Sequence, residues 1–242
     1  MNASAYSRPL NFFWALGLPL AVMILLLSIE PTRLDFALAD AFYDPGTGFI
    51  GRHSAFLEDV LHDRAKQLVI LIGLIAIAGS ILSLFWPPLK SWRKSLGYLV
   101  LAMGTCTAIV MPLKKLTDVP CPWSLVQYGG NQVYSPLLSE RPATNKANLC
   151  WPGGHASSGF TLFAFYFFLR DRRPRLARLA LTTALALGCV FSVGRMMQGA
   201  HFLSHNLWTA LFDWLICLGF YRLMLYHPTP SSEKATSATP AL

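Results

Sequence analysis

Six long apolar segments dominate this 242-residue sequence. They cover residues 10–29, 68–86, 96–113, 156–169, 176–193 and 203–225. A helix needs about 20 apolar residues to cross the hydrocarbon core of a bilayer, and only the phenylalanine-rich fourth segment falls well short of that length. The composition agrees, because 54% of the residues are hydrophobic and 13% are charged. We therefore predict an all-α, polytopic membrane protein with a bundle of six transmembrane helices.

The basic residues predict how this bundle is oriented. With six spans, both termini lie on one side of the membrane. Asp171 and Glu233 are the acidic residues assigned to that side, and they are outnumbered by its basic residues, which are Arg8, Lys90, Arg93, Lys94, Arg170, Arg172, Arg173, Arg175, Arg178, Arg222 and Lys234. Such an excess marks the cytoplasmic side. We attribute the net charge of +8 to this topology and not to nucleic-acid binding.

The connection between the first two segments is too long for a simple turn. Its pattern predicts two amphipathic helices, one with an apolar face that includes Leu34 and Leu38, and one capped by Ser54. We expect them to lie on the outer membrane surface and to form a cap with the loop at 114–154. Residues 1–226 then make one membrane domain, and residues 227–242, rich in Ser, Thr and Pro, are predicted to be a disordered cytoplasmic tail.

Three short polar stretches occur in order, each at the outer end of an apolar segment. They are Lys114 with Cys121-Pro122 after six residues, Pro152-Gly153-Gly154-His155, and Arg195 with His201 after five residues. Ionisable residues at such positions are seldom incidental, and glycine N–H groups that open a helix can bind an anion. Together the stretches resemble the motifs of the type 2 phosphatidic acid phosphatase superfamily, Lys-x6-Arg-Pro, Pro-Ser-Gly-His and Ser-Arg-x5-His-x3-Asp.

Four positions depart from the pattern of that family. Cys121 and Gly153 stand where the family has arginine and serine, and Gly194 and His205 stand where it has serine and aspartate. The first substitution removes one of three cations. Residues that would restore the cation are Lys115, Arg141 and Lys146.

The resemblance implies phosphoryl transfer through a phosphohistidine, with no metal and no cofactor. His201 would be the nucleophile, and His155 would protonate the leaving group and later activate water. His205, one turn after His201, would accept the imidazole N–H that the family's aspartate accepts, without its negative charge; Asp118 and Glu140 are the alternatives. The groups expected to hold the phosphate are Lys114, Arg195, Gly153 and Gly154.

We therefore expect a multi-pass protein of a bacterial inner membrane whose site faces the periplasm. It would remove the terminal phosphate of a lipid phosphate or diphosphate, of the undecaprenyl diphosphate, phosphatidic acid, phosphatidylglycerol phosphate or lipid A type. The alternatives are a lipid-to-lipid phosphotransferase and a catalytically silent protein that binds lipid phosphates. On the oxidising side, Cys121 and Cys150 form either a disulfide or two free thiols. The sequence leaves the oligomeric state open.

Overall fold

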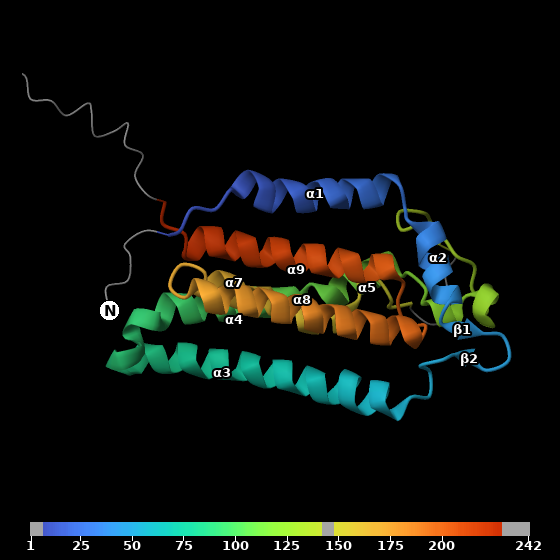
Figure 1. The fold of residues 1–242 in the computed structure, drawn as a ribbon, viewed down its shortest axis with the longest axis horizontal. Helices are drawn as coiled ribbons and strands as arrows, with labels where there is room; N and C mark the ends of the chain where they lie inside the picture. Colours follow the sequence, from blue (N-terminus) through green and yellow to red (C-terminus); the bar gives the residue numbers. More distant parts are fainter. Residues whose placement is uncertain (1–6, 142–147, 229–242) are drawn as a thin grey trace, which may run out of the picture.

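The computed structural model describes residues 7–141 and 148–228, without the side chains at 60–62 and 65. The longest helices run along its long axis (Figure 1). These are α1 (Phe12–Ser28), α3 (Ala65–Phe85), α4 (Arg93–Ala108), α8 (Pro174–Met197) and α9 (Leu203–Met224). Many large apolar side chains on α1 and α3 are exposed, including Phe13, Ile24 and Ile75, as expected of surfaces that face lipid. Of the predicted disordered tail, residues 229–242 lie outside the described part of the chain.

Four candidate membrane spans meet the length and hydropathy of a transmembrane helix within the described residues, where the sequence predicts six. They are Lys66–Phe85, Pro87–Ser124, Pro174–Met197 and Leu203–Met224. A fifth candidate joins α1 to α2 (Thr32–Asp40) across an 84° bend. The fourth predicted segment is instead two short helices, α6 (Gly154–Phe160) and α7 (Phe163–Leu169), which lie inside the bundle against α4, α8 and α9.

Two glycines allow α6 to approach α8 closely. A Cβ atom on Gly159 would lie 2.4 Å from the backbone nitrogen of Gly188, and one on Gly188 would lie 2.2 Å from the ring of Phe160. Small residues at such crossings let the backbones of membrane helices pack against each other. This contact holds α6 against α8, and the start of α6 and the end of α8 carry the second and third motifs.

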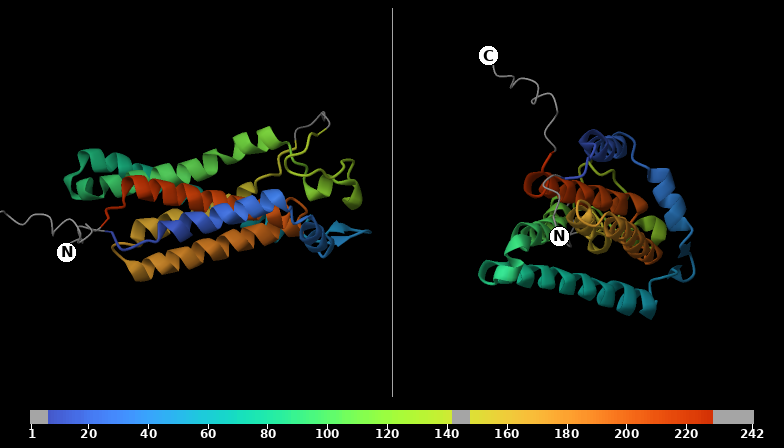
Figure 2. Two further views of the ribbon diagram at one scale, coloured as in Figure 1. Left: turned by 90° about the horizontal axis from the view of Figure 1, so that it is seen from above. Right: turned by 60° about the vertical axis from the view of Figure 1, so that its left-hand side comes forward.

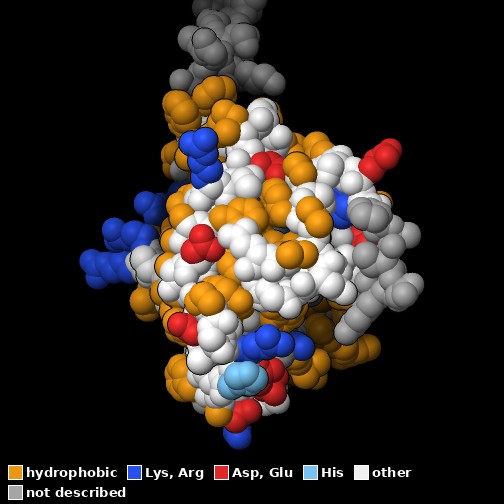
Figure 3. All heavy atoms as spheres, turned by 90° about the vertical axis from the view of Figure 1, so that its right-hand side faces the viewer, with side chains coloured by type: hydrophobic (Ala, Val, Ile, Leu, Met, Phe, Trp, Pro, Cys, Tyr) orange, Lys and Arg blue, Asp and Glu red, His pale blue; other side chains and the backbone are white. Residues whose placement is uncertain are grey.

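The two ends of the bundle differ in composition. One end carries the basic residues of the 3-10 helix η2 (Pro87–Trp92), of the start of α4 and of the turn between α7 and α8. The other end carries a cap made of α2, a π-helix η1 (Phe56–Arg64), the 3-10 helices η3 (Pro122–Ser124) and η4 (Val126–Tyr128), and a small β-hairpin (Figure 2). Charged and hydrophobic side chains are mixed on this end face (Figure 3).

The hairpin is an element that the all-α prediction lacks. Its strands β1 (Tyr43–Asp44) and β2 (Gly48–Phe49) are antiparallel, with Tyr43 opposite Phe49. The turn is stabilised by Asp44, whose Oδ1 accepts the N–H groups of Gly46 and Thr47. Asx turns of this kind are a local alternative to helix, so the amphipathic pattern before it ends in a strand pair.

Acidic side chains hold α2 onto the rest of the cap. The Asp35 carboxylate accepts both the backbone N–H and the hydroxyl of Ser204 at the start of α9, and Asp40 accepts the hydroxyl of Tyr128 at 2.7 Å. Asp35 is 4% exposed. A carboxylate that accepts a free N–H group at the N-terminus of a helix stabilises that end, so Asp35 of α2 caps the end of α9 that follows the third motif.

Candidate active site

All three sequence motifs meet at the cap end of the bundle. Lys114 lies in α5 (Val110–Thr117), His155 lies in the first turn of α6, and Arg195 lies in the last turn of α8. His201 lies in the connection between α8 and α9. Burial is the main cause that lowers the pKa of His201, and the charges of Lys114, Arg195 and His155 contribute to the same effect.

His201 is buried, at 4% exposure, and its Nδ1 atom is 2.7 Å from the backbone carbonyl oxygen of Cys150. A carbonyl only accepts hydrogen bonds, so Nδ1 carries the proton and donates it. The lone pair of the neutral ring is therefore on Nε2. Burial, reinforced by the charge of Lys114, lowers the pKa of His201 well below its usual range. The ring is thus held as a neutral base with one defined tautomer.

His205 does not take the place of the family's aspartate. Its ring centroid is 6.0 Å from that of His201, and the N–H of His201 is accepted by Cys150 instead. The Nδ1 atom of His205 is buried without a hydrogen-bond partner among the described residues. His205 instead lines a cavity of about 30 Å³, together with Asp35 and Ser204. A backbone carbonyl therefore orients the predicted nucleophile.

Lys114 lies over the start of α6. A Cβ atom on Gly154 would be 3.5 Å from the ammonium nitrogen of Lys114. Gly154 is the first residue of α6, so its N–H has no acceptor within the helix. The N–H of Gly153, predicted as a second phosphate donor, is donated to the carbonyl of His205 at 3.1 Å. Lys114 and the N–H of Gly154 are therefore available as donors to an anion at this helix start.

Asn206 explains why position 153 is glycine. A Cβ atom there would lie 2.3 Å from Oδ1 of Asn206, whose Nδ2 donates to the carbonyl of Phe202. Asn206 is 2% exposed, so the space that a serine at position 153 would need is already filled. The sequence pattern did not single out Asn206, because one asparagine in an apolar segment carries no spacing signal.

Arg195 is oriented by a chain of two hydrogen bonds. Its Nη1 donates to Oε1 of Gln198 at 2.7 Å, and Nε2 of Gln198 donates to Oε2 of Glu58 at 3.1 Å. The guanidinium carbon is 5.8 Å from the ring centroid of Trp123. Gln198 and Glu58 are also absent from the sequence-based site. The only signal for Gln198 is its position one turn after Arg195.

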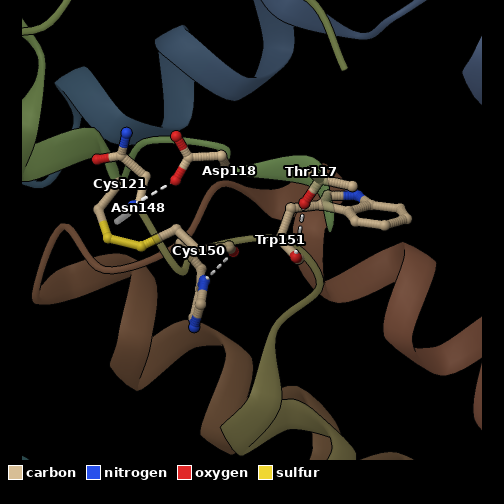
Figure 4. Close-up of a disulfide and its surroundings, with 7 residues drawn as sticks. Thr117, Asp118, Cys121, Asn148, Cys150 and Trp151 are labelled. Carbon is tan, nitrogen blue, oxygen red and sulfur yellow. Dashed lines mark hydrogen bonds between the residues drawn. A yellow bond between two sulfur atoms is a disulfide. The ribbon is translucent and has the colours of Figure 1, made fainter. Parts of the chain in front are cut away.

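A disulfide joins Cys121 to Cys150, with 5.1 Å between the Cα atoms (Figure 4). It links the first motif to the second. Asp118 accepts the backbone N–H of Asn148 at 2.6 Å beside it, and Thr117 donates to the carbonyl of Trp151 at 3.2 Å. Cys150 is the residue whose carbonyl orients His201, so these contacts hold the acceptor in place.

Most of the residues that were expected to replace the family's arginine and aspartate make other contacts or are exposed. Arg141 donates to the backbone carbonyls of Thr117 and Pro136, Lys115 is exposed, and Lys146 lies outside the described residues. Asp118 binds Asn148, and no hydrogen bond joins Glu140 to His201 in the described part of the chain. Within that part, no group of three or more His, Cys, Asp or Glu side chains is arranged to hold a metal.

Comparisons with known proteins identify a family and a similar fold. The family model described as the PAP2 superfamily matches residues 95–228, more than half of the chain. The chain is 28% identical over 220 residues to a lipid A 4'-phosphatase of Francisella tularensis subsp. novicida (strain U112), across 88% of this chain and 96% of that protein. Its fold is similar to the crystal structure of a transmembrane PAP2 type phosphatidylglycerolphosphate phosphatase from Bacillus subtilis. The TM-score is 0.56, with 17% identity, 87% of this chain covered and 96% of that chain covered.

Proposed function

Since this chain belongs to the PAP2 superfamily of membrane lipid phosphatases, we propose that it hydrolyses the terminal phosphate of a lipid phosphate through a phosphohistidine at His201. The observation that carries this proposal is the 2.7 Å contact between His201 Nδ1 and the carbonyl of Cys150. It leaves the Nε2 lone pair available for attack on phosphorus. The nucleophile is therefore neutral and oriented before the substrate binds.

In the first step, Nε2 of His201 bonds to phosphorus while the bond from phosphorus to the lipid oxygen breaks. His155 gives its proton to that oxygen, so the lipid leaves as an alcohol or as a shorter phosphate. In the second step, His155 takes a proton from water, the water oxygen bonds to phosphorus, and the bond to His201 breaks. Inorganic phosphate leaves, and both histidines return to their starting states.

Lys114 and Arg195 supply the positive charge that the transferring phosphoryl group requires. Arg195 is suited to two phosphate oxygens because of its planar fork, and the N–H of Gly154 is a third donor. The family's aspartate is replaced in its orienting role by a neutral carbonyl. Stabilisation of the transition state then depends more on the two cations than on a charge behind the nucleophile.

We place the site on the periplasmic side of a bacterial inner membrane, with both termini in the cytoplasm; the two described ends of the chain lie together, where the N–H of Ser7 donates to the carbonyl of His227. The end of the bundle opposite the site carries the basic residues of η2, of the start of α4 and of the turn between α7 and α8, and the positive-inside rule assigns that end to the cytoplasm. The disulfide at the site end suits an oxidising compartment. The substrate is a lipid phosphomonoester or diphosphate, of the lipid A, phosphatidylglycerol phosphate, phosphatidic acid or undecaprenyl diphosphate type.

The test is phosphate release by the purified protein in detergent from these four lipids. We expect release from at least one lipid, and loss of that release in His201→Ala. His53→Ala is the control, because His53 is an exposed histidine of the same cap. Release that persists in His201→Ala contradicts the proposal. Label transferred to a second lipid, with no free phosphate, identifies a phosphotransferase instead.

A further inference from the structure

A polar pocket lies beside the phosphate site and shares Arg195 with it. Its volume is about 300 Å³, and its walls are Arg52, Glu58, Trp123, Arg195 and Gln198. We propose that this pocket binds the sugar ring to which the phosphate is attached, so that the substrate is a glycolipid phosphate. The inference rests on the proposed function, since it extends the headgroup site of the same reaction.

The pocket is formed by separate cap segments that backbone hydrogen bonds hold against the end of α8. Gly51 donates to the carbonyl of Met197 at 2.9 Å, and Trp123 donates to the carbonyl of Gly199 at 2.9 Å. A Cβ atom on Gly51 would lie 2.9 Å from the backbone of Met197, so this approach requires glycine. The pocket walls are therefore present before a ligand binds, which lowers the cost of ordering them.

The unpaired polar atoms of the pocket match a group that both donates and accepts. Glu58 uses Oε2 to hold Gln198, and within the described residues its Oε1 has no partner. The guanidinium of Arg52 and the indole N–H of Trp123 also have none there. Sugar hydroxyls can donate to the carboxylate and accept from the guanidinium and indole. The indole also offers an apolar surface for the C–H groups of the ring.

The charge of Glu58 argues against a second phosphate in the pocket. A diphosphate would place an anionic group against this carboxylate, and like charges at such distances repel. A glycerol unit has too few hydroxyls to use the carboxylate, the guanidinium and the indole together. Arg195 belongs to both the phosphate site and the pocket. A phosphate bound to Arg195 therefore leaves its directly attached group at the mouth of the pocket.

The test compares turnover of a phosphorylated glucosamine lipid, phosphatidic acid and undecaprenyl diphosphate by the purified protein. We expect kcat/KM to be highest for the glucosamine lipid. Arg52→Ala should lower the ratio of glucosamine-lipid to phosphatidic-acid kcat/KM by about tenfold, mainly through KM, because a hydrogen bond from a charged group is lost. Glu58→Gln keeps an oxygen for Gln198 but removes the charge. It should lower the same ratio and raise relative turnover of the diphosphate.

Arg64→Ala and Asp59→Asn are the matched controls, because both residues lie in η1, are exposed and do not line the pocket. Ratios that are the same in wild type, Arg52→Ala and Glu58→Gln overturn the inference while leaving the phosphatase intact. If no lipid is hydrolysed, the proposed function fails. The inference is then tested by measuring the binding of sugar and glycerol phosphates with calorimetry. Tighter binding of glucosamine 6-phosphate than of glycerol 3-phosphate, lost in Arg52→Ala, supports the pocket; equal binding refutes it.

Discussion

Restoring the family's serine at position 153 should damage this protein. A serine Cβ would lie 2.3 Å from Oδ1 of Asn206, whereas ordinary contacts begin at 3.4 Å. Asn206 cannot turn away freely, because it is buried and its Nδ2 donates to the carbonyl of Phe202 at 3.1 Å. Overpacking of this kind costs about 1–3 kcal/mol. A cost of about 2 kcal/mol corresponds to a fall in Tm of about 4–8 °C for a chain of this size.

Activity should fall as well, because the same residue ties α6 to the third motif. The N–H of Gly153 donates to the carbonyl of His205, and its carbonyl accepts the hydroxyl of Thr209 at 3.1 Å. Displacing Gly153 moves the first turn of α6, which carries His155. We therefore expect Gly153→Ser to lower kcat, although it brings the sequence closer to the family motif.

The assays are thermal unfolding in detergent and phosphate release. Asn206→Ala removes the clashing oxygen, so the double variant should be more stable than the two single effects predict, by about 0.5–3 kcal/mol. Gly219→Ser is the matched control, since nothing lies within 4 Å of a Cβ at Gly219 in the same helix as Asn206. Wild-type stability and activity in Gly153→Ser would refute the reasoning.

Further predictions concern the surroundings of His201 and the cap of α9. Replacing Cys121 and Cys150 by serine should destabilise the protein by about 3 kcal/mol. It should also lower kcat, because the carbonyl that orients His201 is then less firmly held. A Tm equal to that of the wild type would contradict this prediction. The acid limb of kcat/KM should lie below pH 6.5, because burial lowers the pKa of His201 and the nucleophile stays neutral above that lowered pKa. By linkage, His201 should also make the free energy of unfolding fall as the pH drops below about 6.5, because the unfolded chain then binds a proton that the folded chain does not. An acid limb of kcat/KM above pH 6.5 would contradict both pH predictions. Asp35→Asn should lower stability by about 1 kcal/mol, because it weakens the cap at the start of α9, and it should reduce kcat. Asp40→Asn is the comparison, because it alters only the contact to the outer loop.

The spacing of the three motifs was enough to select the side chains that we propose as catalytic or phosphate-binding, since a motif can be recognised from the order of its residues alone. Lys114, His155, Arg195 and His201 each stand at a motif position, and the structure brings them to one end of the bundle. The acceptor for His201 was not predictable, since every residue has a backbone carbonyl and nothing marks that of Cys150. Asn206 and Gln198 were missed for a similar reason: each acts through one contact that depends on how α6, α8 and α9 pack.

Apolar length predicted most of the bundle but misjudged its centre. Residues 154–169 form two helices with a break at Thr161 and Leu162, because this segment is enclosed by other helices and need not span the bilayer alone. The amphipathic pattern located α2 and η1, with Ser54 accepting the N–H of Leu57 at 3.4 Å. It gave no sign of the hairpin between them, which depends on the side chain of Asp44.

The most direct test of this account is to locate the covalent intermediate. The purified protein would be mixed with a ³²P-labelled lipid phosphate, quenched within milliseconds under alkaline conditions, and digested for mass spectrometry. We predict acid-labile phosphate on the peptide that contains His201, and none on that peptide in His201→Ala. Label on another residue, or equal labelling of His201→Ala, would contradict the assignment of His201 as the nucleophile.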